Sequence, residues 1–433
     1  MAELRLPPAG ESRQTHVIDR VEPGPRPAGR LHRAVLRIDA ATPPKRDRAI
    51  DVLRALSIVG VVLGHWLVTA IVLHTDNHLL GASPLHDVPA LTPLTWVLQP
   101  LAVFFFVGGR VAAQGYATAR LRKVRYRPWL ARRVRRLTRP TVPLLSLWAL
   151  VLAGMAATGT AHETIHTLLN LVVSPLWFLL VFGVLTAATP LLYRHGARIA
   201  VGAGAVVALL DIAHFASGGA AWAEQLRDVN TLAGWLVPYC LGAAWSAGAF
   251  ARRRSAVALL IGGTLATAGL ILWGGYPASM VGVPGSELSN LNPVSLAAVT
   301  FGLAQCGGAL LLCRPLRRAV AAPRPGPGVP ADAQLRARPG QFLWSAVTSL
   351  NSSAMTVFLW HQTAMLAVTT LTLGLGEPLF ALHTSPGTLA WAAVRSAWML
   401  VFAVALLALC AAFRQVERDA SRTAPDRQNG TVA

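Results

Sequence analysis

The sequence predicts an all-α polytopic membrane protein. Hydrophobic residues make up 54% of the 433-residue chain and charged residues only 13%, a balance typical of proteins that cross the bilayer many times. Its formal net charge of +20 is concentrated in alternate connections between the apolar stretches, as the positive-inside rule requires of cytoplasmic segments. We therefore expect a multi-pass protein of the plasma membrane with both termini cytoplasmic. The same placement of charge predicts that the basic segments are attracted to anionic lipid of the bilayer and that the protein does not bind nucleic acid.

About ten apolar stretches are long enough to span a membrane, because a spanning helix needs about 20 residues. We expect these spans near residues 50–74, 93–116, 140–158, 167–193, 197–216, 230–250, 255–274, 292–313, 345–373 and 387–412. An even number of spans places both Arg-rich tails on one side. The four cysteines all lie within apolar stretches, so we interpret them as small buried hydrophobes and not as disulfides or metal ligands.

The membrane domain is expected to cover residues 48–412, between two cytoplasmic tails. Residues 1–47 are rich in proline and charge and lack hydrophobic periodicity, which predicts a disordered N-terminal tail. Residues 413–433 form the C-terminal tail. Residues 314–341, rich in Pro, Gly and Arg, predict a cytoplasmic linker before the last two spans.

The first expected span contains three ionisable residues, Asp51, Arg54 and His65. Charged groups inside a span are unfavourable, so each is a functional candidate. Arg54 and His65 lie eleven positions apart, which is three helical turns plus about 20°, so both face the same way. The structural alternative is an arginine that reaches the interface and a histidine satisfied by packing.

Arginines also gather near the cytoplasmic end of the second span and in the connection after it. Arg110 follows the run FFFVGG and lies at a depth similar to that of Arg54. Gly108 and Gly109 permit close approach of another helix. Five arginines, including Arg136 and Arg139, occupy residues 132–139. Because guanidinium groups bind phosphate in a bidentate manner, these residues predict an anion site open to the cytoplasm. Alternatively, they only orient the helices.

Two residues of later spans reach the expected depth of His65. His361 lies about sixteen residues into the ninth span, and His65 about fifteen into the first; Trp177 enters the fourth span from outside to nearly the same level. If these helices are neighbours, the site is layered, with arginines at the inner face and histidines deeper. If they are not, His361 and Trp177 are ordinary packing residues.

Residues His162, Glu163 and His166 match the pattern HExxH. On a helix, the two histidines share a face and can bind zinc, with the glutamate as base. The match lies in a short outer loop, and no third ligand follows in a recognisable context. We therefore expect no metal, and keep a membrane metalloprotein as a minor alternative.

The intramembrane motifs resemble those of a known family. Asp51-x-x-Arg54 followed by His65 is similar to the first-helix signature of the acyltransferase 3 family of integral membrane O-acyltransferases. The resemblance covers about residues 46–412. One departure is that the stretch after Leu179 lacks the acidic residue that members acting on polysaccharide often carry. The other motifs that carry the resemblance are FFFVGG before Arg110, Arg136-Leu-Thr-Arg139, LWFL at 176–179 and LWHQ at 359–362.

The resemblance implies transfer of an acyl group, often acetyl, from cytoplasmic acyl-CoA to a hydroxyl of a carbohydrate or another acceptor. Acyl-CoA is then a co-substrate, and no bound cofactor is expected. His65 would act as general base or acyl carrier, since a histidine titrates near neutrality, and Asp51 would orient Arg54. The cationic partners of the CoA diphosphate would be Arg110, Arg136 and Arg139, and the residues lining the acceptor site would be Trp177 and His361.

A transporter is the main alternative. Its polar path would run through Arg54, Arg110 and Arg395, the last of which lies in the tenth span. No internal repeat of the kind found in many transporters is visible in the sequence. Asp211 and His214, one turn apart in the fifth span, are expected to pair with each other and have no assigned role.

Overall fold

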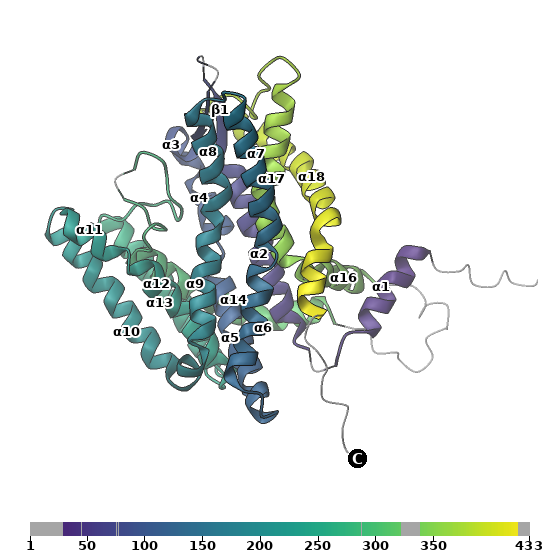
Figure 1. Cartoon of the computed structure of the whole chain (residues 1–433). Helices are drawn as coiled ribbons and strands as arrows, with labels where there is room; N and C mark the ends of the chain where they lie inside the picture. Colours follow the sequence, from purple (N-terminus) through teal and green to yellow (C-terminus); the bar gives the residue numbers. More distant parts are fainter. Residues whose placement is uncertain are drawn as a thin grey trace, which may run out of the picture.

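The computed structural model describes residues 29–44, 46–74, 76, 78–286, 288–321 and 338–422. The described chain is almost entirely helical, with one two-stranded sheet (Figure 1). The elements of its first half are α1 (Arg30–Ala40), α2 (Arg48–Val68), β1 (Ala70–Leu73), β2 (Leu79–Ala82), α3 (Pro84–Asp87), η1 (Pro89–Leu91), α4 (Thr92–Leu98), α5 (Leu101–Leu121), α6 (Tyr126–Thr138), α7 (Thr141–Ala157), α8 (His162–Val173), η2 (Ser174–Leu176) and α9 (Trp177–Ala187). Those of its second half are α10 (Thr189–Ala216), α11 (Ala221–Arg227), α12 (Asn230–Ser246), α13 (Arg253–Trp273), α14 (Leu296–Ala319), α16 (Pro339–Ser352), α17 (Ala354–Leu373) and α18 (Leu389–Arg422).

Eight helical stretches of the described chain are long and apolar enough to cross a membrane. The pair α16 and α17, bent by 78°, gives a ninth if it is counted as one span. The helix α12 occupies the expected span 230–250 but has only 17 residues. A full crossing needs about 20 residues. The structure thus confirms a polytopic all-α membrane protein, while its eight or nine qualifying stretches fall short of the ten expected.

The first expected span ends earlier than the sequence suggests. Helix α2 begins at its N-cap Asp47, whose carboxylate accepts a hydrogen bond from the backbone N–H of Ala49, and it ends at Val68. The β-branched residues that follow form β1 instead, paired antiparallel with β2, because extended backbone suits such side chains. Arg395 of α18 donates to the carbonyls of Trp66 and Thr69 at 2.8 and 2.7 Å. It thereby satisfies carbonyls that the end of α2 leaves free.

The tails also differ from expectation. Residues 1–28 and most of the linker, residues 322–337, lie outside the described residues. Arg30–Ala40, expected to be disordered, forms helix α1, because Asp39 accepts a hydrogen bond from Gln341 of α16 at 2.9 Å and the indole of Trp344 donates to Thr42 at 2.8 Å. At the other end, α18 continues to Arg422, beyond the expected boundary at 412.

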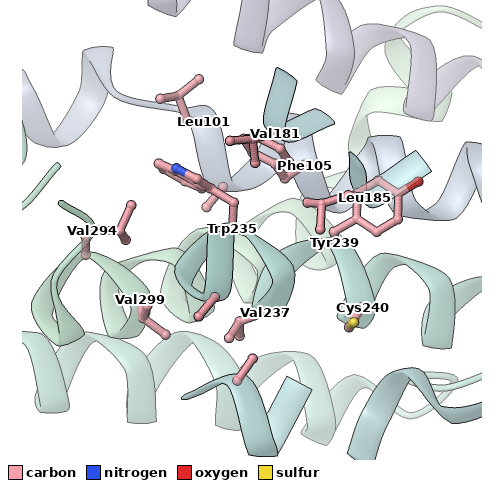
Figure 2. Packing of buried hydrophobic residues seen from close by; sticks show 14 of the residues in the cluster. Leu101, Phe105, Val181, Leu185, Trp235, Val237, Tyr239, Cys240, Val294 and Val299 are labelled. Carbon is pink, nitrogen blue, oxygen red and sulfur yellow. The ribbon is translucent and has the colours of Figure 1, made fainter. Parts of the chain in front are cut away.

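One core of the molecule lies between α5, α9, α12 and α14 (Figure 2). Phe105 of α5 stacks on Trp235 of α12 with ring centroids 5.0 Å apart. A Cβ atom at Gly109 would collide with the carbonyl of Tyr239. The glycine therefore permits the close helix approach that the sequence predicts, and the neighbouring helix is α12. A second core joins α2, α7, α8, α17 and α18. All four cysteines are buried and none is in a disulfide within the described residues.

Asp211 of α10 is the centre of a buried polar network, and its partner is not His214. Its carboxylate accepts hydrogen bonds from Arg227 at 3.1 Å and from Tyr276 at 2.9 Å. His214 lies 3.1 Å from Glu224 instead. The network holds α10 against α11 and the connection before α14, because a buried carboxylate is stable only when it is paired and hydrogen-bonded. Burial raises the pKa of Tyr276, and the nearby charge of Asp211 raises it further.

Candidate active site

The structure brings His65 and His361 together. Helices α2 and α17 lie side by side, and the indole of Trp66 donates a hydrogen bond to the carbonyl of His361 at 2.9 Å. This bond fixes the register of the two helices, so the imidazole rings of His65 and His361 have their centroids 5.1 Å apart. The sequence placed the two residues at similar depth, and the structure supplies the neighbouring helices that this arrangement required.

The protonation of His361 follows from its surroundings. Its Nδ1 lies 2.6 Å from the carbonyl oxygen of Phe358, one turn earlier in α17. A carbonyl only accepts, so Nδ1 carries the hydrogen and donates it. The opposite nitrogen, Nε2, is buried and has no hydrogen-bond partner among the described residues. In the neutral imidazole, Nε2 of His361 is therefore the unprotonated ring nitrogen, and it lies in an apolar setting next to His65.

His65 forms part of the wall of a cavity of about 480 Å³, which we call the histidine cavity. The side-chain amide of Gln362 lies 3.3 Å from Nδ1 of His65 and lines the same cavity. The remaining walls come from β2, α3, η1, α4, the start of α5, the end of α8 with η2, and the connection between α13 and α14. The imidazole of His65 is thus in contact with a space large enough for a small organic molecule.

A second cavity, of about 140 Å³, contains three arginines, and we call it the arginine cavity. Arg54 comes from α2, and Arg133 and Arg136 come from α6. The guanidinium of Arg133 lies over the ring of Trp129, 4.2 Å from its centroid, in space that Gly115 leaves open. Three phenylalanine rings and several aliphatic side chains supply the rest of its lining. Such a site combines positive charge with an apolar surface, which suits a phosphate-bearing molecule that also has an aliphatic part.

Aromatic rings connect the two cavities. Phe178, in the wall of the arginine cavity, has its ring centroid 4.9 Å from that of Phe358. The ring centroids of Phe358 and His361 are 5.9 Å apart, and His361 contacts His65. Arg54 and His65 are eleven residues apart on α2, about 16 Å along the helix axis. A single helix therefore contributes a cation to one cavity and an imidazole to the other.

Arg110 lies apart from both of these cavities. Its guanidinium is 3.8 Å from the ring centroid of Trp245 and 3.9 Å from the carboxylate of Asp47. Asp47 also accepts two hydrogen bonds from Arg317, at 3.0 and 2.7 Å. Burial opposes ionisation of this carboxyl, but the hydrogen bond from Arg317 and the charges of Arg317 and Arg110 hold its pKa below the usual range. Arg110 thus helps to join α5, α12, α14 and the start of α2.

The other predicted site residues also occupy particular positions. Asp51, expected to orient Arg54, has its carboxylate 2.6 Å from Nε of Arg46. Arg139 is exposed directly after α6 and does not line the arginine cavity as far as the described residues define it. Trp177 stacks against Trp235, 6.1 Å between centroids, and belongs to the first core instead of either cavity wall.

The residues of the two alternative functions lie elsewhere. Arg395 is buried against the end of α2, where its guanidinium donates hydrogen bonds to backbone carbonyls. This structural role differs from that of a group lining a polar path together with Arg54. His162 and His166 are exposed at the start of α8, with ring centroids 6.4 Å apart, and His166 lies 3.1 Å from Asn170. Within the described residues, no group of three or more His, Cys, Asp or Glu is arranged to hold a metal ion.

Two residues of the site were not singled out from the sequence. Arg133 forms an Arg-x-x-Arg pair with Arg136, the same spacing that Arg136 forms with Arg139, and only the packing of α6 shows which pair lines the cavity. Gln362 directly follows His361 in the LWHQ motif. Its amide points to His65, a contact that required knowledge of how α2 and α17 pair.

A comparison with protein families identifies the family of the chain. The sequence model of the acyltransferase 3 family, described as an acyltransferase domain, matches residues 47–413. Comparisons with curated proteins and with solved structures gave no significant match. The match covers both cavities and the two histidines between them, and nearly all of the membrane helices. The chain therefore belongs to the acyltransferase 3 family and is a membrane acyltransferase.

Proposed function

We propose that the chain transfers a short acyl group from acyl-CoA to a hydroxyl of a carbohydrate or another acceptor, with His65 at the reacting centre. The observation that carries this proposal is the pair of imidazoles between the two cavities. His65 contacts a space that fits an acceptor, and His361 lies behind it with an unpartnered ring nitrogen. A hydroxyl must lose its proton to attack a thioester, and an imidazole is suited to accept it.

The donor is assigned to the arginine cavity. Its volume of about 140 Å³ holds only part of CoA, so the nucleotide would remain outside, next to the exposed arginines of α6. Arg133 and Arg136 would bind phosphate oxygens, and Arg54 would lie further along the narrow pantetheine arm. The apolar wall of phenylalanines suits that arm and the acyl group. This side of the molecule is the cytoplasmic side under the orientation that the sequence predicts.

The chemistry is a transesterification of a thioester. The acceptor oxygen attacks the thioester carbonyl carbon, a C–O bond forms, and the C–S bond breaks. The hydroxyl proton passes to an imidazole and then to the departing sulfur, so that the products are an ester and free CoA thiol. His361 would support His65 in this step through Nε2, which could accept a proton or stabilise the protonated imidazole of His65.

Two routes fit the arrangement and differ in one intermediate. In direct transfer, His65 acts only as general base. In relayed transfer, a ring nitrogen of His65 first attacks the thioester, and the acyl group travels on the imidazole to the acceptor. Arg54 and His65 are separated by about 16 Å along α2. This distance is compatible with either route, because the pantetheine arm is long and flexible.

The proposal is tested with the purified full-length protein in lipid nanodiscs and acyl-CoA labelled in its acyl group. We expect release of free thiol that depends on added alcohol, together with a labelled ester. Acid quenching before the alcohol is added separates the routes, because label on a peptide containing His65 supports the relay and unlabelled protein supports direct transfer. Thiol release no faster than in empty nanodiscs, for every acyl-CoA and every alcohol supplied, would overturn the proposal.

A further inference from the structure

The histidine cavity has an unusual composition for a site that would bind a glycan. Of the 24 described residues that line it, none is Asp, Glu, Lys or Arg, and His65 is the one titratable residue. Seventeen of them are Leu, Val, Ala, Pro or Gly. The same set of described residues includes no Phe, Tyr or Trp, so the cavity offers no aromatic platform on which a sugar ring would stack.

Two polar side chains of the walls, Ser83 and Thr95, are committed to the protein. Ser83 caps α3 by accepting a hydrogen bond from the backbone N–H of Leu85. Thr95 donates to the carbonyl of Thr92 at 2.7 Å and accepts from the N–H of Met280 at 3.0 Å. Their oxygens therefore stabilise the connections around the cavity and have little capacity left for a ligand with many hydroxyls.

Unsatisfied polarity is concentrated at one end of the cavity, around His65. Gln362 is 1% exposed, and its Oε1 has no hydrogen-bond partner among the described residues. The amide contacts His65, which in turn contacts His361. A ligand that fits this arrangement has a hydroxyl at the His65 end and an apolar body along Leu94, Leu98 and Leu101.

The cover of the cavity lies away from the arginine cavity. The residues that close it come from β2, α3, α4 and the connection at Val281–Gly282. Figure 1 shows β1 and α3 at one end of the helical bundle and α6, which supplies two of the cavity arginines, toward the other end. An acceptor therefore reaches His65 from the end opposite to the donor.

We propose that the acceptor is an uncharged, predominantly aliphatic alcohol that fits within about 480 Å³, and not a glycan. This inference rests on the proposed acyl transfer and adds its substrate class. Burial of aliphatic surface stabilises the complex by about 25 cal/mol per Å², whereas a carboxylate placed here would lose its hydration without gaining a cationic partner.

The test uses the native protein in nanodiscs with labelled acetyl-CoA and three alcohols. These are methyl 10-hydroxydecanoate, the corresponding free hydroxy acid, and methyl glucoside. The first two share a carbon skeleton and differ in charge. We expect the efficiency kcat/KM for the methyl ester to exceed that for the hydroxy acid and for the glucoside by at least about tenfold, because a tenfold change needs only 1.36 kcal/mol of differential interaction.

A pair of variants on α4 locates the effect. Leu94 lines the cavity, whereas Val97 is 72% exposed and does not. Leu94→Lys should shift the preference toward the hydroxy acid by about tenfold, and Val97→Lys should leave it unchanged. Monodisperse elution and a Tm equal to that of the native protein show that each variant is folded.

The possible outcomes separate the two proposals. Equal or better transfer to the glucoside or the hydroxy acid by the native protein overturns the acceptor class and leaves acyl transfer intact. An unchanged preference in Leu94→Lys likewise overturns the assignment of this cavity. Failure to consume acetyl-CoA with any of the three alcohols overturns the acceptor class and counts against the proposed function itself.

Discussion

The imidazole rings of His65 and His361 lie 5.1 Å apart, although 295 residues separate them in the sequence. Trp66 binds the backbone of His361 from the position next to His65, so the pair is set by the docking of two helices and not by a flexible loop. Rigid placement of this kind favours catalysis because the reacting groups need little further ordering. The pair also lies between a cavity lined by arginines and a cavity without formal charge.

His361 is expected to support catalysis through Nε2. The substitution His361→Phe keeps a ring of similar size in the core and removes both nitrogens. We expect kcat to fall by about 10²-fold, within the range for a group that assists proton transfer, with KM for acyl-CoA unchanged because the donor cavity is intact. Steady-state kinetics in nanodiscs measures both quantities. Unaltered kcat in His361→Phe would show that His361 only fills space.

Gln362 is a positioning residue for His65. Its amide nitrogen lies 3.3 Å from Nδ1 of His65, so the amide donates to Nδ1 and holds the imidazole in one orientation. Gln362→Leu removes this donor and should lower kcat by about tenfold, whereas Gln362→Asn, which keeps an amide N–H, should lower it less. The split between kcat and KM is the measurement. Equal losses in both variants, or none in either, would contradict a positioning role.

The arginine cavity should determine affinity for the donor. Arg133→Gln and Arg136→Gln are each expected to raise KM for acetyl-CoA by about tenfold, since a hydrogen bond to a charged group contributes about 1.5–3 kcal/mol. Arg127→Gln, on the exposed side of the same helix, is the matched control. With acetyl-pantetheine, which lacks the phosphates, all three variants should behave like the native protein. A persistent difference would mean that the arginines act on something other than phosphate.

Asp47 should stabilise the junction of α2, α5 and α14. Because its pKa is lowered in the folded protein, its contribution is present above the unfolded pKa and is lost as pH falls through the lowered value. Asp47→Asn keeps an N-cap residue and removes the charge. Since the pair with Arg317 is partly exposed, we expect about 1 kcal/mol, or about 2 °C in Tm at pH 7.

The pH dependence supplies the control for this prediction. The difference in Tm between the native protein and Asp47→Asn, measured in detergent, should shrink as the pH is lowered from 7 to about 3, below the usual range of an aspartate. Glu377→Gln, at an exposed position, should have the same Tm as the native protein throughout. A difference that stays constant with pH would show that charge is not the cause.

Hydropathy and charge placement predicted the polytopic helical fold, because the bilayer requires long apolar helices. They did not predict the end of α2 at Val68, where Arg395 satisfies the last carbonyls. Nor did they predict the 78° bend between α16 and α17. This bend follows Asn351 and two serines, side chains that compete with the helix for backbone hydrogen bonds.

In the site as well, features that depend on local sequence were predicted, and features that depend on the packing of distant helices were not. Helical spacing alone placed Arg54 and His65 on one face of α2. The direction in which the Arg110 side chain points depended on which face of α5 packs against α12. The glycines at this contact do not indicate which helix will pack there. For the same reason Arg133 and Gln362 could not be chosen from the sequence alone, because their positions depend on the packing of α6 and α17.

The most direct test compares His65→Ala with His166→Ala in the release of CoA thiol. His166 is an exposed histidine outside both cavities, and both variants are first checked for folding and membrane insertion. We expect His65→Ala to lower acceptor-dependent thiol release by at least about 10²-fold and His166→Ala to match the native protein. Native activity in a folded His65→Ala variant would contradict the central claim.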